Sequence, residues 1–162
     1  MVDATTFRFL ISLAVRALEV NKDHFRLRED NEDFLGPEVS YLSAIGALMY
    51  LTSHSRPDIS FSVNLLARFS SCPTRRHWNG VKQVLHYLQG RKEMGLFFAY
   101  QFQKDLIGFA DAGFMSDPHN GNSQTGYVFT YGGTSISWRS MKQTIVATSS
   151  NHSEILAIHE AS

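Results

Sequence analysis

The heptapeptide LIGFADA spans residues Leu106–Ala112. Its apolar run predicts a hydrophobic strand that ends at a single carboxylate, Asp111. Further strands are predicted over residues 95–100, 125–131 and 134–138. Two glycines separate the last two of these strands and predict a hairpin, because both turn positions can then adopt positive φ. The expected arrangement is an antiparallel meander.

A terminal helix is predicted from residue 151 to residue 162, and it carries Glu154 near its start. Thr148, Ser149 or Ser150 is expected to provide its N-cap. The sheet is expected to cover its apolar residues, with Glu154 directed toward the end of the Asp111 strand. These apolar residues are Ile155, Leu156 and Ile158.

Residues 40–92 are predicted to be helical. Ser40 is a suitable N-cap for a first helix that is apolar nearly all round, and we expect that helix to be buried on most sides. Pro57 suits the first turn of a second helical segment. Thr74 caps a third, in which Trp78, Val81, Leu85 and Leu88 recur at helical spacing. The fold class is therefore α+β, a helical segment followed by an antiparallel sheet with one terminal helix.

Composition gives no general preference for an anionic partner. The 162 residues carry 15 Lys plus Arg and 15 Asp plus Glu, so the formal net charge is zero. The single cysteine, Cys72, excludes an internal disulfide and is expected to be an inert thiol. No apolar run approaches the about 20 residues of a transmembrane helix.

Residues 1–20 have the features of a secretion leader. Arg8 precedes the apolar run from Phe9 to Val15, and small residues stand at positions minus three and minus one of a cleavage site after Ala17. The alternative interpretation is an amphipathic N-terminal helix.

Residues 21–39 form a charged linker. A basic Arg-Leu-Arg is followed by acidic residues, an order similar to the RxLR and dEER pair that follows the signal peptide of oomycete effectors. A strict RxLR motif would need arginine where Phe25 stands. The candidate translocation residues are Arg26, Leu27, Arg28, Glu29, Asp30, Glu32 and Asp33.

Arg75, Arg76 and Lys82 form a basic face on the third helix and are candidates for contacting a nucleic-acid backbone. An ordinary solvated face is the favoured interpretation, because the chain is neutral overall. His77 and His86 have no partners at the spacing of a zinc site and are assigned to surface or cap roles.

Several separated segments together resemble the Pol polyprotein of copia-type retrotransposons, in the family's order, over roughly residues 16 to 162. The region resembled is the end of the reverse transcriptase, its connection, and the start of ribonuclease H. Residues 40–92 would then be connection-like and residues 93–162 a truncated ribonuclease H-like segment. The segments that carry the resemblance are Arg56–Ile59, Arg75–Leu88, Gly108–Ala112, Ser123–Tyr127, Ile136–Trp138, and Val146–Ser150 with Glu154.

The resemblance implies that Asp111 and Glu154 are the first two acidic ligands of the ribonuclease H metal site, where the ion is Mg or Mn. A two-metal hydrolase needs several carboxylates that converge on cations about 3.5–4 Å apart. The sequence stops eight residues after Glu154 and contains no Tyr-x-Asp-Asp polymerase signature. We therefore expect no enzymatic activity and no cofactor, with both residues vestigial.

The resemblance also implies an exposed apolar edge. In complete ribonuclease H folds a later parallel strand lies beside the strand that holds Asp111. Unless residues 96–100 or another chain covers that edge, it invites self-association.

Two classes of function follow. The first is a non-catalytic interaction protein similar to retroelement-like RxLR effectors, secreted and then active in the host nucleus or cytoplasm on unidentified host proteins. The second is an inactive, intracellular remnant of a copia-type Pol polyprotein. A nucleic-acid-binding module that uses Arg75, Arg76 and Lys82 is a third, less favoured alternative.

Overall fold

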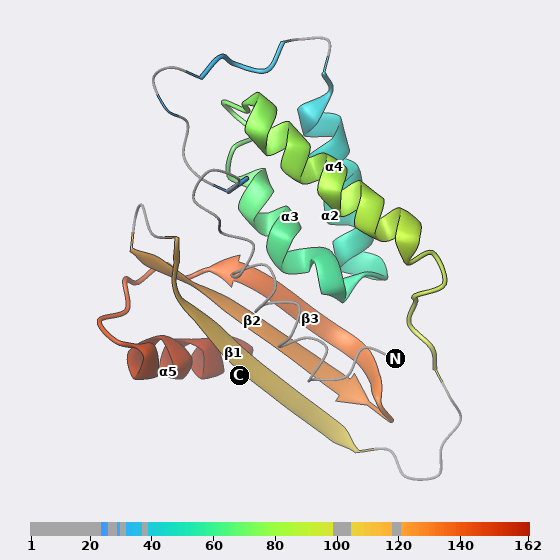
Figure 1. Cartoon of the computed structure of the whole chain (residues 1–162). Coiled ribbons are helices and arrows are strands. Elements are labelled where there is room, and N and C mark those ends of the chain that lie inside the picture. Colours follow the sequence, from blue (N-terminus) through green and yellow to red (C-terminus); the bar gives the residue numbers. More distant parts are fainter. Residues whose placement is uncertain (1–23, 26–28, 30–31, 37–38, 99–104, 118–120) are drawn as a thin grey trace. The chain divides into compact units, whose positions relative to one another are not determined.

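The computed structural model describes residues 24–25, 29, 32–36, 39–98, 105–117 and 121–162 (Figure 1). The chain divides into two compact units, and the boundary between them falls between Met94 and Gly95. The first unit is helical, whereas the second contains a three-stranded antiparallel sheet and a C-terminal helix. The predicted α+β class is confirmed.

The helical unit packs its helices around one apolar core. Tyr41, Ile45 and Leu48 from the first helix meet Val63 and Leu66 from the third element. The Tyr41 hydroxyl donates a hydrogen bond of 2.8 Å to the Leu66 carbonyl, so this buried polar group is satisfied. The elements of this unit are α2 (Tyr41–His54), η1 (Pro57–Ile59), α3 (Ser60–Ala67) and α4 (Arg75–Gly90).

The expectation that the first helix is buried on most sides is wrong. Only one stripe of α2 is buried, at Tyr41, Ile45, Leu48 and Thr52. This spacing of four, three and four residues is one helical face. Apolar residues on the other faces, such as Leu42 and Tyr50 with 67% and 65% exposed surface, remain open.

A capping box fixes the start of α4. The Thr74 amide donates to His77 Nδ1 at 3.0 Å, so Thr74 is the N-cap that its sequence position predicts. His77 has a cap role and is fully buried, with its ring stacked on Phe69 at 4.0 Å between centroids. The histidine therefore serves both the cap and the core.

A buried ion pair stabilises the turn before α3. Arg56 Nε and Nη2 donate to the two carboxylate oxygens of Asp58 at 2.9 and 2.6 Å. Arg56 also donates to the Arg91 carbonyl at 3.2 Å, and its guanidinium lies 5.8 Å from the centroid of the Tyr87 ring. The hydrogen bond to Asp58 raises the pKa of Arg56, while burial raises the pKa of Tyr87.

The sheet unit is a meander in the order β1-β2-β3, with every neighbouring pair antiparallel. Gly132 and Gly133 have φ of +56° and +78°, which confirms the predicted hairpin turn. The expected strand over residues 95–100 is wrong for residues 95–98, which have no regular structure, and residues 99–100 lie outside the described part. The elements are β1 (Leu106–Asp117), β2 (Asn122–Tyr131), β3 (Thr134–Lys142) and α5 (Ser150–Ala161).

Helix α5 lies against β1 and β2 (Figure 1). It buries the small residues Ser153 and Ala157, one turn apart, with no exposed surface on either. The expectation that Ile155 and Ile158 face the sheet is wrong, because 65% and 60% of their surface is exposed. A small-residue face allows the helix backbone to approach the sheet closely and leaves these isoleucines on the outer side.

Within the described residues, no helix is long and apolar enough to cross a membrane.

Candidate functional site

Asp111 lies in the middle of β1, at an edge of the sheet as described. It pairs in register with Gly126 of β2, and its side chain is half-buried. Nearby Gly108 lets the ring of Phe129 cross the strand, since a β-carbon on Gly108 would stand 2.6 Å from a ring atom. In the segment Gly108–Asp111, Gly108 is therefore needed for packing against Phe129, and Asp111 provides the carboxylate.

Glu154 lies on α5, whose first turn is fixed by local hydrogen bonds. Ser149 is the N-cap, and its hydroxyl accepts a hydrogen bond of 3.2 Å from the His152 amide. This bears out the expected cap. The Glu154 side chain is half-buried.

Gln143 connects this helix to the sheet. Its amide nitrogen donates to Thr125 Oγ1 at 3.0 Å and to the Ser153 carbonyl at 2.9 Å. Its backbone amide donates to the Ser123 carbonyl at 2.9 Å. Because Gln143 has only 1% exposed surface, these hydrogen bonds form in a dry environment and position the residue that precedes Glu154.

The two predicted acidic residues thus lie on packed elements, β1 and α5. Among the described residues, no group of three or more His, Cys, Asp or Glu side chains is placed to hold a metal ion. A two-metal hydrolase needs more carboxylates than Asp111 and Glu154 provide. The residues described do not fit the metal centre that the family resemblance implies, and the lack of a cofactor stays a prediction.

The candidate translocation residues are only partly covered. Arg26, Leu27, Arg28 and Asp30 lie outside the described residues. Glu29, Glu32 and Asp33 are described, and the Glu29 amide donates to Glu32 Oε2 at 3.2 Å. This hydrogen bond is local and exposed to solvent.

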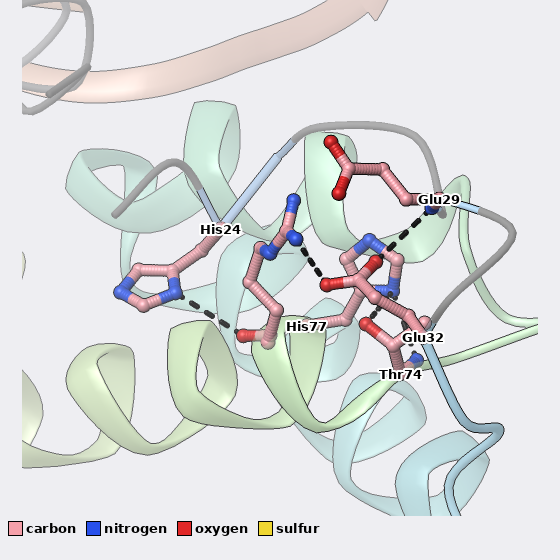
Figure 2. A network of polar contacts seen from close by, with 6 residues as sticks. His24, Glu29, Glu32, Thr74 and His77 are labelled. Carbon is pink, nitrogen blue, oxygen red and sulfur yellow. Dashed lines mark hydrogen bonds and ion pairs between the residues drawn. The ribbon is translucent and has the colours of Figure 1, made fainter. Parts of the chain in front are cut away.

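The candidate nucleic-acid residues have different environments. Arg75 and Lys82 are exposed and lie seven residues apart, on one face of α4. Arg76 instead forms an ion pair with Glu32, in which each side chain retains 20% of its exposed surface (Figure 2). The predicted basic face therefore has one of its three charges neutralised within the chain.

Sequence reasoning missed the Glu32–Arg76 pair and the hydrogen bond from His24 Nδ1 to the Arg76 carbonyl, 3.1 Å long. The linker carries acidic residues and the start of the helix carries basic residues, and this complementary charge is the sequence signal that indicates the contact.

Comparison with known proteins gives close relatives. The chain is 43% identical over 123 residues to secreted RxLR effector protein 161 of Plasmopara viticola, a match that spans 76% of this chain and 87% of that protein. It is 41% identical over 123 residues to the Pol polyprotein from transposon TNT 1-94 of Nicotiana tabacum. The chain is a relative both of this effector and of transposon Pol polyproteins.

The relatives of this chain differ greatly in length. The match spans 9% of the tobacco Pol polyprotein, and 49% of an uncharacterized mitochondrial protein of Arabidopsis thaliana that is 32% identical over 118 residues. No protein-family model and no solved structure matches the chain. The sequence resemblance to copia-type Pol is confirmed.

Proposed function

We propose that this copia-type Pol relative is a secreted, non-catalytic effector that acts inside host plant cells by binding proteins. The single observation that supports this proposal most strongly is the 43% identity, over 87% of its length, to a protein named as a secreted RxLR effector. The leader-like residues 1–20 and the charged residues 21–39 occur in the order that such a protein requires.

The absence of catalysis is supported by the geometry of the two acidic residues. Asp111 and Glu154 lie on β1 and α5, and the described residues contain no group of three or more His, Cys, Asp or Glu side chains placed to hold a metal ion. Two carboxylates neutralise too little charge to hold a pair of divalent cations at the spacing that phosphodiester hydrolysis needs. The function is therefore assigned to the surface of the protein.

Export is tested with a reporter fused to residues 1–40 and expressed in an oomycete. We expect the reporter in the culture medium, cleaved after Ala17. A matched fusion in which Leu10 and Leu13 are replaced by Asp should stay in the cell. Retention of the unmodified fusion at full length would contradict the secretion proposal.

Catalysis is tested with an RNA–DNA heteroduplex, the purified chain, and Mg²⁺ or Mn²⁺. We expect no cleavage above a metal-free control. Cation-dependent cleavage that disappears in Asp111→Asn would contradict the non-catalytic assignment.

The alternative function is an inactive, intracellular remnant of a Pol polyprotein. The 41% identity to the tobacco transposon protein supports this ancestry, and the exposed Arg75 and Lys82 are compatible with vestigial nucleic-acid binding. The remnant hypothesis predicts that both reporter fusions remain inside the cell.

A further inference from the structure

The linker of the helical unit docks on the start of α4. We call its described part, His24, Phe25, Glu29 and residues 32–36, the acidic arm. Glu32 pairs with Arg76, and His24 donates to the Arg76 carbonyl (Figure 2). The arm therefore contacts both the charge and the backbone of a single α4 residue.

Backbone hydrogen bonding extends this contact. The Leu35 amide donates to the Pro73 carbonyl at 2.9 Å, and Phe34 forms an isolated antiparallel bridge with Thr74. Main-chain hydrogen bonds of this kind hold a peptide strand that is added to the edge of another protein segment. Because they do not depend on side chains, an extended peptide of another sequence could form the same bonds.

Apolar packing and a close approach complete the contact. Phe25 and Leu35 pack against the core of the helical unit. Gly80 on α4 provides room for His24, because a β-carbon at Gly80 would lie 2.9 Å from the β-carbon of His24. The surface beneath the arm is thus formed by Pro73, Thr74, Arg76 and Gly80.

We propose that this surface is a binding site for an extended acidic peptide of a partner protein, and that the acidic arm fills it within the chain until a partner displaces it. A suitable peptide carries a carboxylate for Arg76, three residues before an apolar side chain, as Glu32 precedes Leu35. This inference names a partner class and a surface for the protein-binding role proposed above, and its biological meaning rests on that role.

The donor and acceptor pattern selects a peptide over a nucleic acid. The Pro73 carbonyl accepts a hydrogen bond from an amide, and a phosphodiester backbone has no N–H group to offer there. The Arg76 guanidinium can pair with a carboxylate or with a phosphate, so the Pro73 carbonyl, not this charge, makes the distinction. The exposed Arg75 adds positive charge next to the surface and would attract an acidic segment.

The test uses the purified full chain and a fluorescein-labelled peptide with the sequence of residues 29–36, EDNEDFLG. The arm competes with the peptide at a high effective concentration, so wild type should bind it weakly. Glu32→Gln weakens the arm and should bind the peptide about fivefold more tightly than wild type does. Glu93→Gln makes the same charge change at an exposed residue after α4 and should bind as wild type does.

Specificity is tested in the Glu32→Gln background. Adding Arg76→Gln should remove the gain in affinity, and a scrambled peptide of the same composition should not bind. On addition of the peptide, NMR shifts should change at the amides of Thr74 and Leu35. Circular dichroism verifies that each variant keeps the helical content of wild type, as expected for a partly exposed ion pair.

Equal peptide affinity in Glu32→Gln and Glu93→Gln would overturn the proposal, as would shifts confined to other parts of the chain or tight binding that survives Arg76→Gln. The binding assay does not depend on secretion. Its failure is therefore distinguishable from a failure of the export experiment.

Discussion

Replacement of Arg56 by Ala should destabilise the helical unit severely, because it leaves a buried carboxylate without its cation. The Asp58 side chain has 1% exposed surface and that of Arg56 has 9%. Removing one partner of a buried ion pair costs about 3–5 kcal/mol. We expect about 4 kcal/mol, because the hydrogen bond to the Arg91 carbonyl is lost as well.

A partly exposed ion pair should contribute much less to the free energy of unfolding than this buried pair does. Glu32→Gln removes the charge from the contact to Arg76, in which both side chains are 20% exposed, and should cost less than about 1 kcal/mol. Arg75→Ala, at an exposed position, should change stability by about 0.5 kcal/mol at most. The larger loss of stability in Arg56→Ala than in Glu32→Gln is then explained by burial, and not by the number of hydrogen bonds alone.

The assay is urea unfolding followed by tryptophan fluorescence in a Trp138→Phe background, so that Trp78 of α4 is the reporter. The free energy of unfolding follows from the midpoint at constant slope. The double variant Arg56→Met with Asp58→Leu should be more stable than Arg56→Ala, because no charge remains buried. A loss below about 1 kcal/mol for Arg56→Ala would refute the argument that Asp58 depends on this partner.

Three further predictions concern single residues. Gln143→Ala should lower the free energy of unfolding of the sheet unit by about 2 kcal/mol, measured with urea, because Thr125 and the Ser153 carbonyl of α5 lose a buried hydrogen-bond donor. A loss under about 0.5 kcal/mol would contradict this reasoning. Burial raises the pKa of Tyr41 in the folded state above its usual 10.0. Above about pH 10 the folded state therefore keeps a proton that the unfolded state loses, and the free energy of unfolding should fall as the pH rises. In unfolding measured at pH 8 and pH 10.5, Tyr41→Phe should reduce this loss, whereas the control Tyr50→Phe, at an exposed residue, should leave it unchanged. Ile107→Lys, on β1 at the edge of the described sheet, should reduce any concentration-dependent association in analytical ultracentrifugation, and association that persists undiminished would exclude that edge as the contact.

Local sequence signals predicted the elements that depend on neighbouring residues. Thr74 and Ser149 cap their helices, and the glycine pair after β2 forms the expected turn. In each case the hydrogen bond or the backbone angle is determined within a few residues. These predictions could be made because they need no knowledge of tertiary packing.

Tertiary packing explains the errors. Helix α2 is apolar on several faces, so its sequence could not show that only the stripe through Ile45 and Leu48 meets the core. On α5, the small residues Ser153 and Ala157 are buried in place of Ile155, because the close approach of the helix selects for size. Hydrophobicity alone would predict that Ile155 is more buried than Ser153 and Ala157, which is the reverse of what the structure has.

In the candidate sites too, local motifs could be recognised in the sequence, whereas tertiary contacts could not. Asp111 and Glu154 were identified by their motif, and the structure places them on β1 and α5, which pack together. The contact between Glu32 and Arg76 joins residues 44 positions apart and could not be inferred from spacing. It depends on the tertiary packing of α4 against the described residues of the linker.

Secretion and processing are measured together by the mass of the protein recovered from the medium of an oomycete that expresses the full chain. We expect a secreted product that lacks residues 1–17 and retains residues 18–162. An unprocessed chain found only inside the cell would contradict the effector assignment and favour the intracellular remnant.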